Sequence, residues 1–148
     1  MATKITYLDA SALVKRYVAE VGTKEVQALL DQVTIVGTAT ITRVEVTAAL
    51  AKAVRMRILS RQEASAALKG FYEDWSSLER LQVTELIISR ASVLAWEKGL
   101  RGYDATHLAS ALVWQEILEE PVIMATFDRR LWEAARSTGL TVWPKVLA

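Results

Sequence analysis

The 148-residue chain contains no cysteine and a single histidine, His107. The absence of cysteine excludes disulfide bonds and thiolate metal sites, and one histidine is too few to build a zinc site. No apolar run approaches the roughly 18 residues that a membrane-spanning helix requires. The first residues, MATKITYLD, contain no signal-peptide core. We therefore expect a soluble, cytoplasmic protein that does not associate with membranes.

The composition is that of a folded protein, because apolar residues make up 52% of the chain and charged residues 24%. A chain of this length predicts one domain, residues 1–148, with a substantial core. The net charge is +1, from 18 basic and 17 acidic side chains. A nucleic acid would therefore have to be bound by local basic patches and not by a global field. Catalysis would have to use carboxylates, hydroxyls, lysines and arginines.

Hydrophobic periodicity alternates along the chain between strand-like and helix-like segments. Ser60 and Glu63 form a capping box at one helix start, and Gly99 marks a helix end. The predicted strands are residues 4–8, 33–39, 80–86, 122–127 and 140–144, and the predicted helices are 10–19, 23–32, 42–57, 60–77, 86–98, 103–118 and 128–139. This alternation predicts an α/β fold, in which helices flank a central parallel sheet of four to five strands.

Three aspartates stand where predicted strands end or predicted helices begin. Asp9 follows the first strand, Asp128 follows the strand at 122–127, and Asp104 opens the helix at 103–118. Sites in open parallel sheets form outside the carboxyl ends of the strands, so Asp9 and Asp128 would project at the same edge. Each aspartate also has a structural explanation, because aspartate is a good helix N-cap. The positions alone leave both explanations open.

Glu45 falls on the apolar face of its predicted helix, in the arc that includes Ile41, Val44 and Ala48. An unpaired carboxylate buried against a core costs several kcal/mol, so it needs a partner, a proton or a metal ion. An ion pair with Lys52, two turns later, is the structural explanation. A pair with Arg43 or Arg129 is a further alternative to a functional role.

Together, Asp9, Glu45, Asp104 and Asp128 could form one acidic pocket. Carboxylates that lie close together repel one another unless a cation joins them. Oxygen ligands without histidine or cysteine suit a hard ion such as Mg²⁺ or Mn²⁺. Such a site can activate water and shield the charge of a phosphodiester. The residues therefore predict a metal-dependent nuclease.

Four sequence blocks carry these acids, and together they resemble a known family. The blocks YLDASALVKRY, TRVEVTAAL, LRGYDATHLASAL and ATFDRRLWEAA are similar in order and spacing to those of PIN-domain ribonucleases. The likeness is closest to VapC-type toxins of prokaryotic toxin–antitoxin pairs, and it extends from residue 5 to about residue 143. One block alone would be a weak signal, whereas four in order form a specific one.

The resemblance implies a PIN-like α/β/α sandwich and a Mg²⁺- or Mn²⁺-dependent endoribonuclease that cleaves RNA. It also implies a homodimer that a VapB-like antitoxin holds inactive. Asp9, Glu45 and Asp104 match the acidic triad of the family, and Asp128 matches a fourth, less constant acidic position. All four are thus expected to be catalytic residues and metal ligands. Which RNA is cleaved does not follow from the likeness.

The remaining positions have supporting roles in this hypothesis. Ser11 and Thr126 match hydroxyl positions of the family, and they are expected to orient carboxylates or waters. Arg129 and Arg130 follow Asp128, and we expect them to bind an RNA phosphate or to compensate the acidic cluster. His107 is expected to be a packed or solvent-facing residue and not a catalytic one.

Two other interpretations compete with the nuclease. A phosphorelay receiver is also doubly wound and acidic, but the chain has one aspartate at its first strand end and carries Pro144-Lys145 in reversed order. A PIN-like domain could also be catalytically silent and serve only to bind another protein. The intact carboxylates oppose that alternative.

Overall fold

Strand pairing in this chain produces one sheet with all strands parallel. A computed structural model describes residues 4–147, and within them five strands pair in the order β3-β2-β1-β4-β5. The strands are β1 (Ile5–Leu8), β2 (Ile35–Ala39), β3 (Glu79–Leu81), β4 (Val122–Ala125) and β5 (Thr141–Trp143). Each neighbouring pair is parallel. The predicted α/β fold with a central parallel sheet is therefore confirmed.

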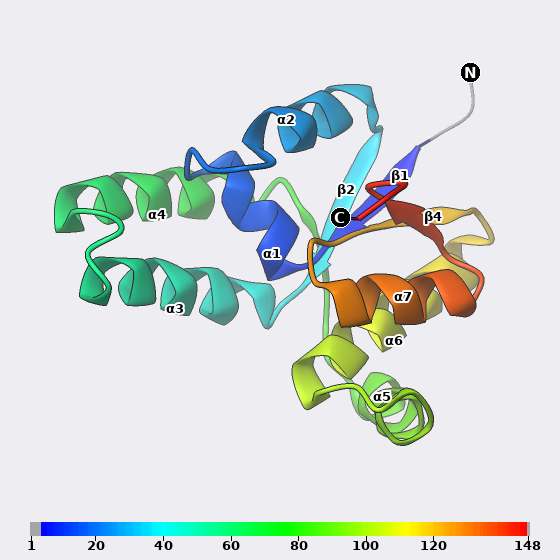
Figure 1. Ribbon diagram of the computed structural model, residues 1–148. Coiled ribbons are helices and arrows are strands. Elements are labelled where there is room, and N and C mark those ends of the chain that lie inside the picture. Colours follow the sequence, from blue (N-terminus) through cyan, green and yellow to red (C-terminus); the bar gives the residue numbers. More distant parts are fainter. Residues whose placement is uncertain (1–3, 148) are drawn as a thin grey trace.

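Helices cover both faces of the sheet, as parallel strands require (Figure 1). The helices are α1 (Ala10–Leu13), α2 (Thr23–Gln32), α3 (Thr42–Arg55), α4 (Arg61–Trp75), α5 (Glu85–Lys98), α6 (Gly102–Leu118) and α7 (Arg129–Ser137). Side chains from α1 to α4 form one buried cluster with Leu8 and Ala125 of the sheet. Side chains from α5 to α7 form a second cluster with Ile5, Tyr7 and Met124 on the opposite face.

The predicted elements are all present, with differences at their ends. The segment predicted as a strand at 80–86 is split, because β3 ends at Leu81 and Thr84 caps α5 through a bond from the Ile87 amide. The helix predicted at 10–19 is α1 followed by a 3-10 turn, η1 (Val14–Arg16). The capping box of Ser60 and Glu63 at the start of α4 is confirmed.

Close contact between α6 and the sheet depends on one glycine. A Cβ atom at Gly37 in β2 would lie 2.5 Å from the ring of Trp114, so any other residue there would push α6 away. Trp114 is buried at this contact. The contact thus holds α6, the helix that carries Asp104 and His107, close against the middle of the sheet.

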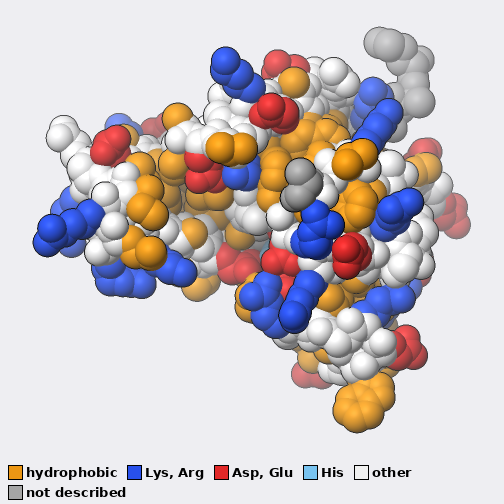
Figure 2. Space-filling view, viewed as in Figure 1, with side chains coloured by type: hydrophobic (Ala, Val, Ile, Leu, Met, Phe, Trp, Pro, Cys, Tyr) orange, Lys and Arg blue, Asp and Glu red, His pale blue; other side chains and the backbone are white. Residues whose placement is uncertain are grey.

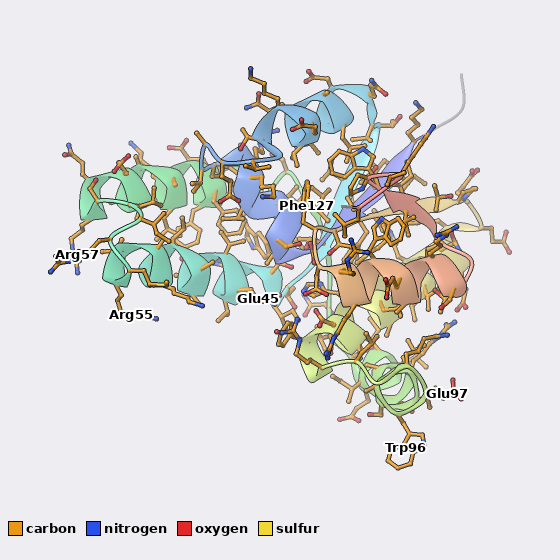
Figure 3. All side chains as sticks on the ribbon, viewed as in Figure 1. Glu45, Arg55, Arg57, Trp96, Glu97 and Phe127 are labelled. Atoms are coloured by element: carbon orange, nitrogen blue, oxygen red, sulfur yellow. The ribbon has the colours of Figure 1, made fainter. Side chains whose placement is uncertain are left out.

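The helices α3 and α4 lie antiparallel and form an arm that projects from the sheet (Figure 1). Arg55 and Arg57 lie at the far end of this arm, whereas Glu45 lies at its base, near the start of α7 (Figure 3). The arm also exposes Met56 and Ile58. The base of the arm therefore brings Glu45 near the centre of the molecule, whereas the far end of the arm lies away from it.

The strand order places a topological switch point at β1. The chain moves from β1 outward through β2 to β3 on one side, and it then crosses to β4 and β5 on the other side. Ligands of open α/β sheets bind in the crevice at such a point, outside the carboxyl ends of the strands. A receiver-type sheet has the order 2-1-3-4-5, in which strand 1 adjoins strand 3. The neighbours of β1 here are β2 and β4, so the receiver alternative is wrong.

In the part of the chain from residue 4 to residue 147, no helix combines the length and the apolar character needed to cross a membrane.

Candidate active site

A cavity of about 110 Å³ opens at the switch point and is lined by acidic side chains. Asp9, Glu45, Asp104 and Asp128 all line it. Acidic side chains gather near the centre of the molecular surface, between the α3–α4 arm and α7, with basic side chains beside them (Figure 2). The fold therefore brings together four carboxylates that are spread over the sequence from residue 9 to residue 128.

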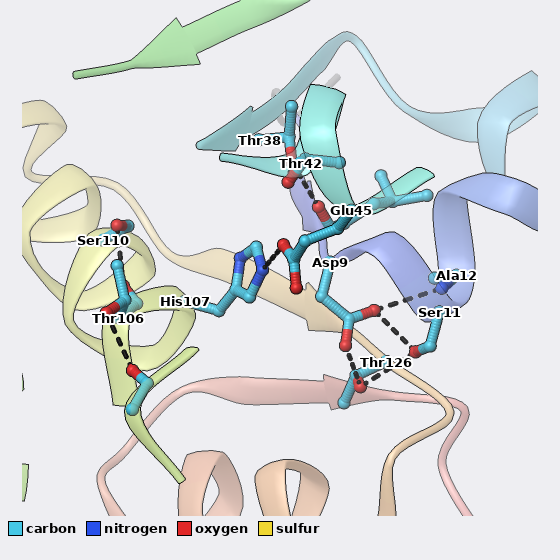
Figure 4. A network of polar contacts seen from close by, with 12 residues as sticks. Asp9, Ser11, Ala12, Thr38, Thr42, Glu45, Thr106, His107, Ser110 and Thr126 are labelled. Atoms are coloured by element: carbon cyan, nitrogen blue, oxygen red, sulfur yellow. Dashed lines mark hydrogen bonds and ion pairs between the residues drawn. The ribbon is translucent and has the colours of Figure 1, made fainter. Parts of the chain in front are cut away.

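Asp9 is held by neutral donors at the end of β1. Its Oδ1 accepts from the Ala12 amide at 3.1 Å and from the Ser11 hydroxyl at 2.7 Å, and its Oδ2 accepts from the Thr126 hydroxyl at 2.6 Å (Figure 4). Asp9 is therefore the N-cap of α1 as well as a lining residue of the cavity. Burial raises the pKa of the Asp9 carboxyl, although the three donors oppose that rise.

The hydroxyls of Thr126 and Ser11 connect the ends of β1 and β4. The Thr126 hydroxyl accepts from the amide of Asp128 at 3.0 Å while it donates to Asp9. The Ser11 hydroxyl accepts from the amide of Phe127 at 3.0 Å. These bonds fix the backbone that precedes α7 to the Asp9 carboxylate. The supporting role predicted for both residues is thus compatible with their geometry, since each orients a carboxylate.

Glu45 projects from the first turn of α3 and meets His107 from α6. His107 Nε2 lies 2.6 Å from Glu45 Oε1 (Figure 4). On the other side of the ring, His107 Nδ1 lies 2.6 Å from the Tyr7 hydroxyl. Burial raises the pKa of the Tyr7 hydroxyl well above its usual value, so Tyr7 stays protonated, and a hydroxyl can serve Nδ1 as a donor or as an acceptor. The Nε2 atom donates to the Glu45 carboxylate, because a carboxylate oxygen accepts.

Asp104 and Asp128 share one cation, Arg101. The Arg101 Nε atom donates to Asp104 Oδ2 at 3.0 Å, and its Nη2 atom donates to Asp128 Oδ2 at 2.8 Å. Burial raises the pKa of the Asp104 carboxyl, and the charge of Asp128 adds to the rise, whereas Arg101 opposes it. Asp128 is also the N-cap of α7, because its Oδ1 accepts from the Leu131 amide.

Comparison with known proteins identifies the fold family. The sequence profile of the PIN domain matches residues 6–137. The chain belongs to the PIN-domain family. A curated relative, Ribonuclease VapC45 of Mycobacterium tuberculosis, is 34% identical over 143 residues, which cover 97% of each chain. This likeness lies within the VapC group of PIN domains.

Two solved structures have the same fold at low sequence identity. VapC20 of Mycobacterium tuberculosis, described as a sarcin-ricin loop cleaving toxin, has a TM-score of 0.66 at 16% identity, covering 97% of this chain and 99% of that chain. A toxin–antitoxin complex from Klebsiella pneumoniae has a TM-score of 0.61 at 17% identity, with the same coverage. At these identities the likeness shows the PIN fold alone.

The PIN fold brings most of the predicted site residues together, with two exceptions. The four acids and Ser11 line the cavity, and Thr126 lies behind Asp9. Arg129 and Arg130 do not line it. The Arg129 guanidinium donates to the Leu147 carbonyl and pairs with Glu133, whereas Arg130 is exposed beside Lys98 and Gly99 in a separate depression.

The structural explanations given by the sequence hold for some of the acids. Asp9 and Asp128 are N-caps in addition to lining the cavity. Asp104 is not an N-cap, because it lies in the first turn of α6 and Arg101 occupies the N-cap position. The partner of Glu45 is His107, so the ion pairs expected with Lys52, Arg43 or Arg129 are wrong.

Three residues of the PIN-domain site were not predicted as parts of it: Arg101, His107 and Tyr7. Arg101 precedes Asp104 by three positions and His107 follows it by three, and residues with this spacing share a helix face. Tyr7 precedes Asp9 by two positions, which places both on one side of the strand. His107 is packed, as expected, but it is hydrogen-bonded to Glu45 in the cavity and is not remote from it.

PIN ribonucleases generally use a divalent metal ion, and the donor chemistry of this cavity fits one. Its acidic lining supplies carboxylate oxygens, the ligands preferred by hard cations. Burial also raises the pKa of two of these carboxyls, and a cation would relieve that unfavourable charge. Within residues 4–147, however, no three acidic or histidine side chains stand together in a metal-binding arrangement. The acids fit the ion in kind, and their side chains must turn to bind it.

Proposed function

We propose that this chain is a metal-dependent endoribonuclease and the toxin of a type II toxin–antitoxin pair. The observation that carries the proposal is the convergence of Asp9, Glu45, Asp104 and Asp128 on one cavity at the switch point of the sheet. The ribonuclease activity named for the relative VapC45 supports the same reaction class. Residues 1–148 would act as one catalytic unit.

The residues have distinct roles in this proposal. Asp9, Asp104 and Asp128 would hold a divalent ion, Mg²⁺ or Mn²⁺, with Glu45 at the edge of the same group. When bound, the ion supplies positive charge that lowers the pKa of a nearby water and neutralises a phosphodiester. Glu45 Oε1 is held by His107, which leaves Oε2 to accept a proton from the attacking water. Thr126 and Ser11 keep the Asp9 carboxylate in place during the reaction.

The substrate and partner follow from the charge of the cavity. An acidic cavity repels an RNA backbone, so basic residues around it are needed to hold phosphates. Arg130, which is exposed and forms no ion pair within the described residues, fits this role better than Arg129, which is engaged by Leu147 and Glu133. A VapB-like antitoxin could inhibit by placing a basic side chain among the same carboxylates. Such a pair would act in the cytoplasm, where its RNA substrates occur.

Cleavage of RNA by carboxylate variants tests the nuclease. Asp9→Asn and Asp104→Asn should each lower the cleavage rate at saturating Mn²⁺ by at least about 100-fold, equivalent to about 2.7 kcal/mol of barrier. Asp31→Asn, which makes the same change at an exposed position of α2, is the matched control and should cut at the wild-type rate. If both cavity variants cut RNA as fast as the wild type, the proposal is wrong.

Growth assays separate a toxin from a silent binding scaffold. Expression of the wild-type chain should arrest growth, and Glu45→Gln should relieve the arrest while the protein still binds its antitoxin. A scaffold would bind its partner equally well in both forms and would arrest growth equally, or not at all. The expected homodimer stays a prediction, which light scattering of the purified protein would test.

A further inference from the structure

One arginine spans two acids of the cavity that come from different elements. Arg101 lies just before α6. Its guanidinium donates hydrogen bonds both to Asp104 of that helix and to Asp128, which ends the segment between β4 and α7. The Asp104 side chain is 4% exposed and that of Asp128 is 26% exposed, whereas the Arg101 side chain is 49% exposed. The arginine thus reaches from the surface into the cavity and joins two separately positioned carboxylates.

The same two oxygens would be needed by a metal ion. Arg101 uses the Oδ2 atoms of both Asp104 and Asp128, and it lines the cavity beside Asp9 and Glu45. A guanidinium that bonds to a carboxylate oxygen occupies the space and the lone pair that a cation would use. Two of the four carboxylates are turned toward the arginine.

We propose that Arg101 is a built-in counter-ion that competes with the divalent metal for Asp104 and Asp128 and withdraws when the metal binds. This inference rests on the metal-dependent function proposed above. In the metal-free protein the arginine keeps two neighbouring carboxylates from repelling each other. When a divalent ion binds there, its higher charge takes over that role and the arginine is released.

The surroundings of Arg101 allow it to leave. Its side chain makes no hydrogen bond that caps α6, so the helix start does not depend on its position. Its Cζ atom lies 4.8 Å from the centroid of the Tyr103 ring, and Tyr103 is 46% exposed at the rim of the cavity. The face of this ring attracts the guanidinium already in its bonded position, so Arg101 can keep this contact when it leaves the two carboxylates and moves outward. There it would lie at the mouth of the cavity, where an RNA phosphate must enter.

Binding of Mn²⁺ to the metal-free protein, measured by calorimetry, tests the competition without any activity assay. Arg101→Gln should bind Mn²⁺ about tenfold more tightly than the wild type, equivalent to about 1.4 kcal/mol, because the competing charge is gone. Arg129→Gln removes the same charge next to Asp128, but at a side chain that contacts Leu147 and Glu133, and it should leave the Mn²⁺ affinity unchanged. Arg101→Lys should fall between the wild type and Arg101→Gln, since one ammonium cannot span both carboxylates as a guanidinium does.

Thermal unfolding distinguishes competition from a merely structural ion pair. Without metal, Arg101→Gln should melt at a lower temperature than the wild type, and saturating Mn²⁺ should raise its melting temperature by more than it raises that of the wild type. A structural ion pair would lower the melting temperature and leave the Mn²⁺ affinity as it was.

Unchanged or weaker Mn²⁺ binding by Arg101→Gln and Arg101→Lys would overturn the inference and leave the nuclease proposal standing. A wild-type protein that binds no Mn²⁺ at all would overturn both. If Arg101→Gln does not fold, the affinity of Arg101→Lys decides, because that variant retains the positive charge.

Discussion

The two sides of the acidic cavity hold their carboxylates by different means. On the side of β1, Asp9 is bound by two hydroxyls and a backbone amide, all of them uncharged. On the side of α6 and α7, Asp104 and Asp128 are bound by a guanidinium. Glu45 is held by one donor, His107 Nε2, and the other nitrogen of that ring contacts the Tyr7 hydroxyl.

Because the two sides differ in this way, the site can be both ordered and ready for a cation. Neutral donors orient a carboxylate and leave its charge in place, whereas a guanidinium both orients and neutralises. The hydrogen-bond partners of Asp9 therefore orient it without neutralising it, whereas Asp104 and Asp128 are compensated by a residue that can move. Three substitutions, at His107, Thr126 and Asp104, test whether the two sides of the cavity differ in this way.

The largest effect is expected at His107, the hydrogen-bond donor to Glu45. His107→Ala should lower the rate of RNA cleavage by about 10- to 100-fold, because Glu45 loses the bond that orients it and residues that orient ligands usually have effects of this size. The measurement is the single-turnover cleavage rate at saturating Mn²⁺.

His107→Gln is the matched control for this substitution. Its side-chain amide can still donate toward Glu45, so it should retain more activity than His107→Ala. Equal losses in the two variants would mean that His107 does not act through that hydrogen bond. Circular dichroism of each variant checks that the buried substitution leaves the fold intact.

A smaller effect is expected at the neutral donor of Asp9. Thr126→Val should slow cleavage by about tenfold, because it removes the hydroxyl that donates to Asp9 Oδ2. A donor to the ionised form lowers the pKa of a carboxyl, so its loss should raise the pKa of Asp9 further. The acidic limb of the pH–activity profile should therefore move to higher pH. Thr126→Ser keeps the hydroxyl and should behave as the wild type; a limb that stays in place in Thr126→Val contradicts the prediction.

The smallest effect is expected on the stability of the metal-free protein. The raised pKa of Asp104 means that the folded state favours the protonated carboxyl over the ionised one. The contribution of the protonated carboxyl to the free energy of unfolding is therefore complete below the unfolded-state pKa of about 3.9. This contribution is lost as the pH rises through the higher pKa of the folded state. Asp104→Asn avoids this loss. At pH 7 it should melt about 2–4 °C above the wild type, the shift that about 1 kcal/mol produces in a domain of this size.

The pH dependence of that difference is the decisive feature. The gap between Asp104→Asn and the wild type should shrink as the pH falls toward 4, because the wild-type carboxyl then takes up a proton. The prediction is contradicted if the difference in melting temperature stays constant with pH, or if Asp104→Asn melts below the wild type at pH 7. Either result would mean that Arg101 stabilises the ionised Asp104 carboxylate by more than burial destabilises it. Asp31→Asn, on the exposed side of α2, should show no such trend.

Most of the fold follows from local patterns, because periodicity and caps report on neighbouring residues. The segment from Thr23 to Gln32 and the capping box at Ser60 match their predictions. The failures lie where two local preferences meet. In residues 80–86, strand-like residues lead directly into the Thr84 cap, and the cap prevails because it satisfies an amide at the start of α5.

The candidate site was predictable only in part. Strand-end positions indicated Asp9 and Asp128, because this signal is local. The helix face that indicated Glu45 is wrong as a buried face: Val44 is 71% exposed and Ala48 is exposed, whereas the buried residues of α3 are Thr42, Val46 and Leu50. The partners of those acids could not be predicted in the same way. The sequence offered Lys52, Arg43 or Arg129 as structural partners of Glu45, whereas the fold pairs it with His107 on α6, a helix on the other face of the sheet.

The helices and strands, their alternation and the identity of the four acids follow from the spacing of residue types along the chain, so they can be predicted without the fold. Three contacts depend instead on how the elements pack: Arg101 spans Asp104 and Asp128, His107 holds Glu45, and Arg129 turns toward Leu147. A charged side chain is stabilised by the nearest opposite charge or donor in space, and strand order and crossover connections, not sequence distance, set which group is nearest.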